Sequence, residues 1–497
     1  MLFTTAAFFF GFLPIVLAGF FAVGRFSRDG AAFWLFAASV FFYGYWMPQF
    51  TLLLLGSIVT NFLIGRRIGE ARAAEAGLAR AKRWMIGGVV FNLALLAYFK
   101  YANFFIDTLD AVLGVQIHAL NVILPIGISF YSFTQIAFLA DAYQKGVREY
   151  KFAHYGLFVT YFPHLIAGPV LHHAQMMPQF GRESTYRFNL ANFAAGLAIF
   201  CIGLVKKVVI ADGISPYADA VFNGTAHGQG PTFQEAWLGS LAYTFQLYFD
   251  FSGYSDMAIG LSWMFNIKLP FNFDSPYKAR NISDFWRRWH MTLSAFLRDY
   301  LYIALGGNRK GAVRRYVNLF LTMLLGGLWH GASWTFVFWG GLHGLYLAIN
   351  HGFRAVTAPI AAKLENSRVF AVASWSLTFL AVVVAWVFFR APTFASAGQI
   401  LAAMVSPTAL GGLPETNPML WNAGLDLQTG LVTCLALGAI AVFAPNSNRI
   451  GELIRDACER AFSRRAALLG GATMLAVLLV VLNEVRESVS AFIYFNF

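Results

Sequence analysis

Residues Tyr316 to Phe353 read YVNLFLTMLLGGLWHGASWTFVFWGGLHGLYLAINHGF and contain no Asp, Glu, Lys or Arg. As one straight α-helix this run would be about 57 Å long, nearly twice the ~30 Å hydrocarbon core of a bilayer. The run must therefore break or turn. We expect the break at Gly326–Gly331, where three glycines permit backbone geometries that other residues resist. His330 would then lie at a helix break inside the membrane, roughly 22 Å of helix from Arg315.

The composition of the whole chain agrees with a membrane environment. Of its 497 residues, 58% are hydrophobic and 12% are charged, and the mean hydropathy is +0.59. Soluble proteins carry about 25% charged residues. We therefore predict an all-α polytopic membrane protein, built as a single integral membrane domain over residues 1–497.

Apolar segments recur along the chain, and a membrane helix needs roughly 20 such residues. From them we estimate roughly 11 to 13 membrane helices, and the shorter segments suggest re-entrant or interfacial helices in addition. The segments are Leu2–Val23, Ala32–Trp46, Phe50–Ile64, Met85–Ile106, Leu120–Leu139, Tyr155–Leu171, Phe193–Ala211, Trp237–Phe251, Tyr316–Phe353, Phe370–Phe389, Leu427–Phe443 and Ala467–Leu482. Residues 407–422 contain no Lys or Arg and are predicted to form a loop on the non-cytoplasmic side.

The net charge of +12 gathers in three basic stretches, which we expect to face the cytoplasm, as short basic loops do. Orientation of the chain in the membrane is enough to explain the two outer stretches. We expect no nucleic-acid partner. The middle stretch is too dense and too aromatic for orientation alone. The stretches are Arg66, Arg67, Arg72, Arg80, Lys82 and Arg83; Lys278, Arg280, Arg287, Arg288, Arg298, Arg309, Lys310, Arg314 and Arg315; and Arg449, Arg455, Arg460, Arg464 and Arg465.

Within the middle stretch, Ser283 to Tyr302 is predicted to be one amphipathic helix, because its aromatic and leucine side chains recur at helical spacing. Asp284 is placed to pair with Arg287 or Arg288. Two interpretations stay open. The arginines could meet anionic lipid headgroups, or they could hold a phosphorylated acyl carrier such as coenzyme A, since guanidinium suits phosphate oxygens.

The turn that follows, Leu305 to Gly311, combines glycines with Asn308, Arg309 and Lys310 and could handle phosphate. It lacks the strand–loop–helix context of a P-loop. On the carrier interpretation, the candidate donor-binding residues are Arg287, Arg288, Arg298, Asn308, Arg309 and Lys310.

Among the ten histidines, His330 is the strongest candidate for chemistry. An ionisable residue deep in a membrane is costly and suggests function, and neutral imidazole is the usual general base near neutral pH. No HxxxH or HExxH pair occurs, so a metal enzyme is weakly supported. The three cysteines are scattered and are predicted to be packing residues. A transporter, or a scaffold that only recruits a modifying enzyme, stays open as a rival class.

Several ordered motifs together resemble the membrane-bound O-acyltransferase (MBOAT) family, in its bacterial branch of alginate-type O-acetyltransferase membrane subunits. The resemblance covers roughly residues 125–355, which it identifies as the family core, with peripheral helices in 1–124 and 356–497. The motifs are PIGISFY (Pro125–Tyr131), IAGP (Ile166–Pro169), FDFSGYSD (Phe249–Asp256), FWRRWH (Phe285–His290), LRDYLYI (Leu297–Ile303), LGGNR (Leu305–Arg309) and LWHG (Leu328–Gly331). One departure is His164, where the family pattern suggests Gln.

The resemblance implies a helical bundle with a central tunnel, His330 as the signature catalytic histidine and His290 as a second, more variable active-site position. It implies that acetyl-CoA donates an acetyl group from the cytoplasm, with no permanently bound cofactor or metal. The group would pass across the bacterial inner membrane to a periplasmic SGNH-type partner, which O-acetylates a polysaccharide such as alginate. D-alanyl or lipid acyl transfer, and a transient acyl-enzyme, stay open as alternatives.

Overall fold

The computed structural model describes residues 3–74, 77–114, 117–120, 122–166, 168–406 and 417–460, together with 471, 474, 475, 479 and 492. All regular secondary structure in these residues is helical, which confirms the predicted all-α class. The chain divides into two compact units. The first comprises Met1–Leu204, Tyr254–Phe271 and Ser447–Val489, and the second comprises Val205–Gly253, Asn272–Asn446 and Ser490–Phe497. The single membrane domain expected over residues 1–497 stays a prediction.

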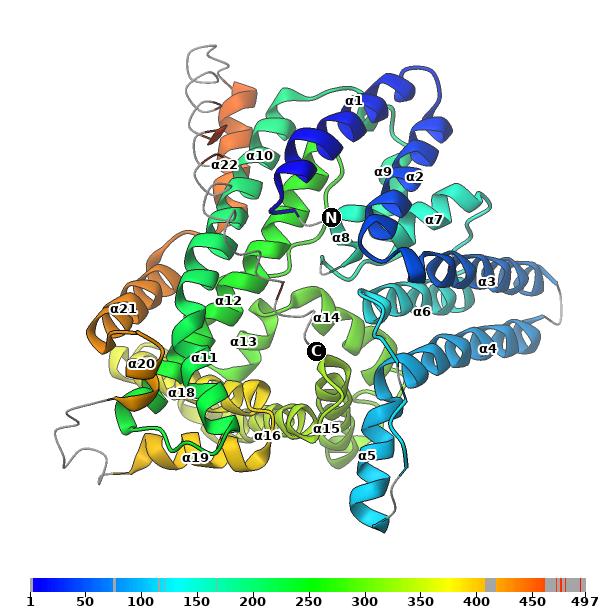
Figure 1. The fold of residues 1–497 in the computed structure, drawn as a ribbon. Helices are drawn as coiled ribbons and strands as arrows, with labels where there is room; N and C mark the ends of the chain where they lie inside the picture. The colour runs from blue at the N-terminus through cyan, green and yellow to red at the C-terminus, as the bar shows by residue number, and fades with distance from the viewer. Residues whose placement is uncertain are drawn as a thin grey trace. The chain divides into compact units, whose positions relative to one another are not determined.

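The first unit contains the N-terminal helices and the helix α22. In Figure 1, α3, α4 and α6 lie side by side, and each of the three packs against the other two. Its helices are η1 (Ala7–Phe12), α1 (Leu13–Gly24), α2 (Arg28–Trp46), α3 (Pro48–Ala73), α4 (Leu78–Leu96), η2 (Ala97–Tyr101), α5 (Ala102–Leu113), α6 (Ile128–Gln144), α7 (Phe152–Thr160), α8 (Phe162–Leu165), α9 (His173–Phe180), η3 (Glu183–Tyr186), α10 (Leu190–Val205) and α22 (Ser447–Arg460).

Small and polar residues hold α3, α4 and α6 together. A Cβ on Gly65 would lie 2.5 Å from the Phe138 ring, so only a glycine lets these helices approach so closely. The buried amides of Asn61 on α3 and Asn92 on α4 bond each other reciprocally, at 2.7 and 3.3 Å. Close backbones and interhelical amide bonds are how helices associate in lipid, where apolar side chains gain little from pairing.

The second unit contains the remaining helices. The long helix α12 (Phe233–Met264) contributes its residues up to Gly253 here and the rest to the first unit. The others are η4 (Lys206–Ala211), α11 (Asp212–Ala226), η5 (Pro276–Lys278), α13 (Ile282–Arg288), α14 (Met291–Phe296), η6 (Leu297–Tyr302), α15 (Gly311–His330), α16 (Trp334–Thr357), η7 (Ala358–Ile360), α17 (Ala361–Glu365), α18 (Arg368–Arg390), α19 (Phe394–Val405), α20 (Pro418–Asn422) and α21 (Leu427–Phe443).

The uncharged run breaks where its glycines predict. Helix α15 ends at His330, three residues form a turn, and α16 begins at Trp334. The two helices pack backbone to backbone, because a Cβ on Gly340 would lie 2.3 Å from the carbonyl oxygen of Met323. A Cβ on Gly327 would meet the Phe336 carbonyl oxygen at the same distance. This contact fixes the end of α15 against α16.

The prediction of one helix from Ser283 to Tyr302 is wrong. Helix α13 ends at Arg288, α14 begins at Met291, and the segment from Leu297 continues as the π-helical η6. His290 lies at the break in a left-handed conformation, with φ 43° and ψ 53°. Backbone hydrogen bonds from the preceding segment stabilise the break: Asp274 N donates to Arg288 O, and Met291 N donates to Asn272 O, both at 2.9 Å.

Five helices in the described residues are long and apolar enough to cross a membrane, or six if the bent pair α21–α22 counts as one span. They are Ala7–Gly24, Pro48–Ala73, Leu78–Leu113, Leu190–Ala226 and Arg368–Arg390. The number is lower than the 11 to 13 estimated from the sequence, because length and composition alone leave out long helices such as α12, α15 and α16. The protein is a multi-pass membrane protein.

Two other sequence predictions concern segments that the described residues cover only in part. Most of the expected span at Ala467–Leu482 and most of the expected loop at 407–422 lie outside them, and the described end of that loop forms the short α20. The first basic stretch is not a loop throughout, because α3 continues to Ala73 and carries Arg66, Arg67 and Arg72 in its last turns.

Candidate active site

The two histidines singled out from the sequence come together inside the second unit. His290 is 0% exposed and His330 is 3% exposed, and their ring centroids lie 6.3 Å apart. Trp329 lies beside both rings, at 6.2 Å from His290 and 5.0 Å from His330. Two imidazoles 40 residues apart in the sequence therefore share one buried site, each at the end of a helix.

The hairpin of α15 and α16 positions His330. It is the last residue of α15, and its ring packs edge-on against Trp339 of α16 at 5.2 Å. Phe389 of α18 lies 5.3 Å away and closes another side. Aromatic walls of this kind exclude water, so a proton or an acyl group handled here would meet few competing solvent molecules.

The break between α13 and α14 positions His290. Its Nδ1 lies 3.1 Å from Oδ1 of Asn272, and its ring sits edge-on to Phe251 at 4.7 Å. The left-handed backbone turns the side chain away from the helical path that the sequence suggested. Asn272 is a functional candidate that the sequence reading missed, because it precedes His290 by 18 residues and belongs to none of the motifs used.

A third buried histidine, His343, lies close to this pair. Its ring centroid is 4.9 Å from that of Trp339, which also contacts His330. The indole Nε1 of Trp286 donates to His343 Nδ1 at 3.3 Å, and the Phe285 ring stacks on the imidazole at an angle of 9°. His343 is therefore held by hydrogen-bonded aromatic packing.

The cations predicted to bind the donor differ in what they already contact. Arg288 bonds Asp284 at 3.0 Å and Asp274 at 3.4 Å, so the expected pairing with Asp284 is confirmed. Arg298 bonds its neighbour Asp299 at 2.7 Å, and this hydrogen bond raises the pKa of the guanidinium. These carboxylates already neutralise both arginines, whose role as phosphate ligands stays a prediction.

The remaining predicted ligands are exposed. Arg287 lies on α13, while Asn308, Arg309 and Lys310 lie in the turn before α15. Gly306, Gly307 and Gly311 have positive φ, as expected for a glycine turn, and the turn is held by Asn318 Nδ2 donating to Gly307 O at 3.0 Å. The tyrosine hydroxyl of Tyr302 donates to the Asn308 amide oxygen.

Arg287 has two neighbouring cations that were not assigned to the site from the sequence. The charges of Arg315, Arg354 and Arg287 all act on the imidazole of His351, so the three side chains lie within electrostatic range of this ring. Ser283 of α13 contacts the same part of α16, because its hydroxyl accepts from Asn350 Nδ2 at 2.8 Å and lies 3.5 Å from His351 Nε2. Arg315 belonged to the basic stretch in the sequence, but Arg354 gave no signal there.

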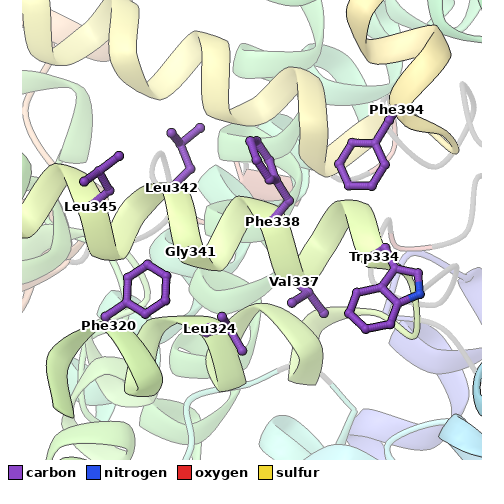
Figure 2. Close-up of a pocket in the computed structure, with 9 residues that line it drawn as sticks. All are labelled: Phe320, Leu324, Trp334, Val337, Phe338, Gly341, Leu342, Leu345 and Phe394. Atoms are coloured by element: carbon purple, nitrogen blue, oxygen red, sulfur yellow. The ribbon is translucent and has the colours of Figure 1, made fainter. Parts of the chain in front are cut away.

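A pocket of about 470 Å³ lies beside α15 and α16 (Figure 2), and neither His290 nor His330 is among the residues that line it. Phe320, Phe338 and Leu345 project into it from these helices, and Phe394 projects from α19. Phe338 and His343 are about 140° apart around α16 at 100° per residue, so they lie on different faces. The described residues that line the pocket are all apolar, aromatic or glycine, so they offer no acid, base or nucleophile for acyl transfer.

The family model of the MBOAT, membrane-bound O-acyltransferase family matches residues 89–389, more than half of the chain. The chain belongs to this family. The predicted membership is confirmed, and the protein is an O-acyltransferase. The matched range is wider than the core expected at 125–355 and contains every predicted catalytic and donor-binding residue.

Similar proteins match this chain over most of its length or over about half of it. A peptidoglycan O-acetyltransferase from Helicobacter pylori is 43% identical over 432 residues, which cover 82% of this chain and 80% of the relative. A probable alginate O-acetylase, AlgI, from Pseudomonas aeruginosa is 46% identical over 411 residues, covering 82% of this chain and 75% of the relative. A teichoic acid D-alanyltransferase from Streptococcus thermophilus is 29% identical over 234 residues, covering 45% of this chain and 56% of the relative.

Proposed function

We propose that the chain takes an acetyl group from cytoplasmic acetyl-CoA and passes it across a bacterial inner membrane for O-acetylation of an extracytoplasmic polysaccharide. The observation that carries this proposal is the pair of buried imidazoles, His290 and His330, at 6.3 Å. Two of the relatives are named for O-acetylation of peptidoglycan or alginate, and these names support a glycan as the final acceptor. A periplasmic SGNH-type partner completes the transfer, and membrane lipid surrounds the protein.

In the proposed reaction His330 is the general base. It takes the proton of an acceptor hydroxyl while the hydroxyl oxygen attacks the thioester carbonyl carbon. The new C–O bond forms, the C–S bond breaks, and coenzyme A leaves as a thiolate that recovers the proton from the imidazolium. His290 orients the acceptor or assists this proton transfer. The aromatic rings around His330 support the role, since a dry site favours attack by the acceptor over hydrolysis.

The cations around His351 support a donor that carries phosphate. Within the described residues Arg287, Arg315 and Arg354 have no carboxylate partner, whereas Arg288 and Arg298 are both paired. Three guanidiniums without a carboxylate partner, all within electrostatic range of His351, favour an anionic ligand, and guanidinium matches phosphate geometry. Arg315 lies 15 residues before His330 on α15, about 22 Å of helix away, so a long, flexible carrier arm is needed to reach the imidazole.

Transfer of D-alanine is the runner-up. It is favoured by the teichoic acid D-alanyltransferases, which are 28% to 29% identical and match less than half of this chain. The O-acetyl relatives are 42% to 46% identical and cover 82% to 92% of it, so acetyl transfer has the stronger support.

The test uses inverted membrane vesicles from cells that make the protein, which contain the native acceptor and expose the cytoplasmic face. Vesicles receive [¹⁴C]acetyl-CoA, and label in the polysaccharide fraction is counted for the wild type, His330→Gln and His227→Gln. His227 is an exposed histidine at the end of α11, so its variant is the control for loss of a histidine as such. We expect a loss of about 100-fold or more for His330→Gln, the contribution typical of a general base, and wild-type labelling for His227→Gln.

Two outcomes would contradict the proposal. Full labelling by His330→Gln would remove this histidine from the chemistry. A wild-type protein that leaves acetyl-CoA intact but incorporates D-alanine would support the runner-up instead.

A further inference from the structure

Asn272 is a fully buried amide that touches the second histidine of the site. It lies ten residues before α13 and is 0% exposed. Its side-chain oxygen Oδ1 is 3.1 Å from His290 Nδ1, 3.3 Å from the backbone nitrogen of Thr292 and 2.9 Å from the Thr292 hydroxyl. One amide oxygen therefore gathers three polar groups from the break between α13 and α14.

The contact with the Thr292 backbone fixes which end of the amide faces the break. A backbone N–H can only donate, so the amide atom that it contacts must be the oxygen rather than the NH₂ group. An amide oxygen in turn can only accept. The Nδ1 atom of His290, which contacts the same oxygen, must therefore carry a hydrogen and donate it.

The tautomer of His290 follows from this chain of bonds. A neutral imidazole carries one N–H, so a hydrogen on Nδ1 leaves the lone pair on Nε2. Nε2 is buried and has no hydrogen-bond partner among the described residues, while Phe251 packs edge-on against the ring. The ring therefore keeps its basic nitrogen available inside the site.

His343 provides the opposite case in the same unit. There the Trp286 indole N–H donates to Nδ1, so Nδ1 carries the lone pair and the hydrogen of the neutral ring is on Nε2. The two buried histidines thus have opposite tautomers, each determined by a single neighbour. This contrast shows that the protein, and not the imidazole itself, selects the basic nitrogen.

We propose that Asn272 is a positioning residue that holds His290 as the Nδ1–H tautomer, so that Nε2 accepts a proton during acyl transfer. This inference rests on the proposed function, because it assumes that His290 takes part in the reaction. Asn272 acts only through His290. Its role corresponds to that of a group that fixes the tautomer and orientation of a catalytic imidazole.

The test compares four variants in the vesicle assay, with rates measured across a range of pH and of acetyl-CoA concentration. Asn272→Leu removes the acceptor, and we expect kcat to fall about 10- to 100-fold while KM for acetyl-CoA is unchanged. Asn272→Asp keeps the accepting oxygen and adds a negative charge, which raises the pKa of the imidazole. A base must be deprotonated to act, so the acidic limb of the rate profile should move up by about 1 pH unit or more, with most activity retained.

His227→Gln and His290→Ala complete the set. His227 is exposed at the end of α11 and contacts none of these groups, so we expect wild-type kcat and an unshifted pH profile for His227→Gln. If Asn272→Leu keeps full kcat while His290→Ala is inactive, the positioning role is refuted and the proposed function stands. If His290→Ala itself is fully active, the role of His290 in the proposed function fails first. Identical losses and unshifted pH profiles for Asn272→Leu and Asn272→Asp would also refute the inference.

Discussion

The close contact between α15 and α16 predicts that one added methyl group reduces catalysis by displacing the end of α15, which carries His330. Gly340 of α16 faces the backbone of α15, and a Cβ there would lie 2.3 Å from the Met323 carbonyl oxygen. It would also lie within 3.1 Å of the backbone of Gly327. A backbone carbonyl cannot rotate away as a side chain can. Gly340→Ala must therefore push the two helices apart.

The displacement follows from the distances. Ordinary contact begins near 3.4 Å, so the helices must separate by about 1 Å at this point. His330 lies one turn beyond Gly327 at the end of α15 and moves with it. Overpacking costs about 1 to 3 kcal/mol of stability, and a misplacement of about 1 Å can lower a catalytic rate about 100-fold. We expect the folded protein to persist with a strongly reduced kcat.

The neighbouring Gly341 supplies a matched control. A Cβ there would lie 3.5 Å from the Phe320 ring, which is ordinary van der Waals contact. Gly340→Ala and Gly341→Ala would be purified in detergent, their thermal unfolding measured, and their acetyl transfer assayed in vesicles. Near wild-type behaviour is expected for Gly341→Ala. Equal activity of the two variants would show that the helix contact does not position His330.

Two further predictions concern charged side chains. Arg315→Gln and Arg354→Gln should each raise KM for acetyl-CoA about 10-fold or more, because a charge-assisted contact contributes about 1.5 to 3 kcal/mol. Arg288→Gln, whose arginine is already paired with carboxylates, should leave KM unchanged; a uniform rise in all three variants would contradict the assignment. Lys207→Met should destabilise the protein by about 3 to 5 kcal/mol in thermal or denaturant unfolding, because buried Lys207 lies 2.7 Å from Asp212 and 2.5 Å from Asp250. The exposed Lys363 of α17 provides the control, and equal stability of Lys363→Met and Lys207→Met would refute this reading.

The parts of the fold that depend on local sequence were predictable. The break near His330 follows from an uncharged run too long for one membrane helix and from the glycines within it, and α15 ends at that residue. The prediction of one helix from Ser283 to Tyr302 failed because the break depends on contacts distant in the sequence. The apolar spacing of this segment is helical, but Asn272 and Asp274 bond the backbone at the break, and such distant contacts leave no periodic signal.

The candidate site was also predictable only where local sequence carries the signal. Motifs identified His290 and His330, and their proximity required only that the family resemblance held. The partners of the arginines could not be predicted, since Arg288 pairs with Asp274, 14 residues before it. Asn272 and Arg354 were missed because a lone polar residue in an apolar sequence gains meaning only from what the fold places beside it.

The central claim is that His290 and His330 act as one catalytic unit, and a double-mutant cycle tests it most directly. Acetyl transfer from [¹⁴C]acetyl-CoA would be measured for His290→Ala, His330→Ala and the double variant, with protein level and thermal unfolding as checks on folding. Residues that act as a unit lose their effect together. We predict that the double variant is no slower than His330→Ala alone. Losses that multiply in the double variant, or full activity in His330→Ala, would contradict the claim.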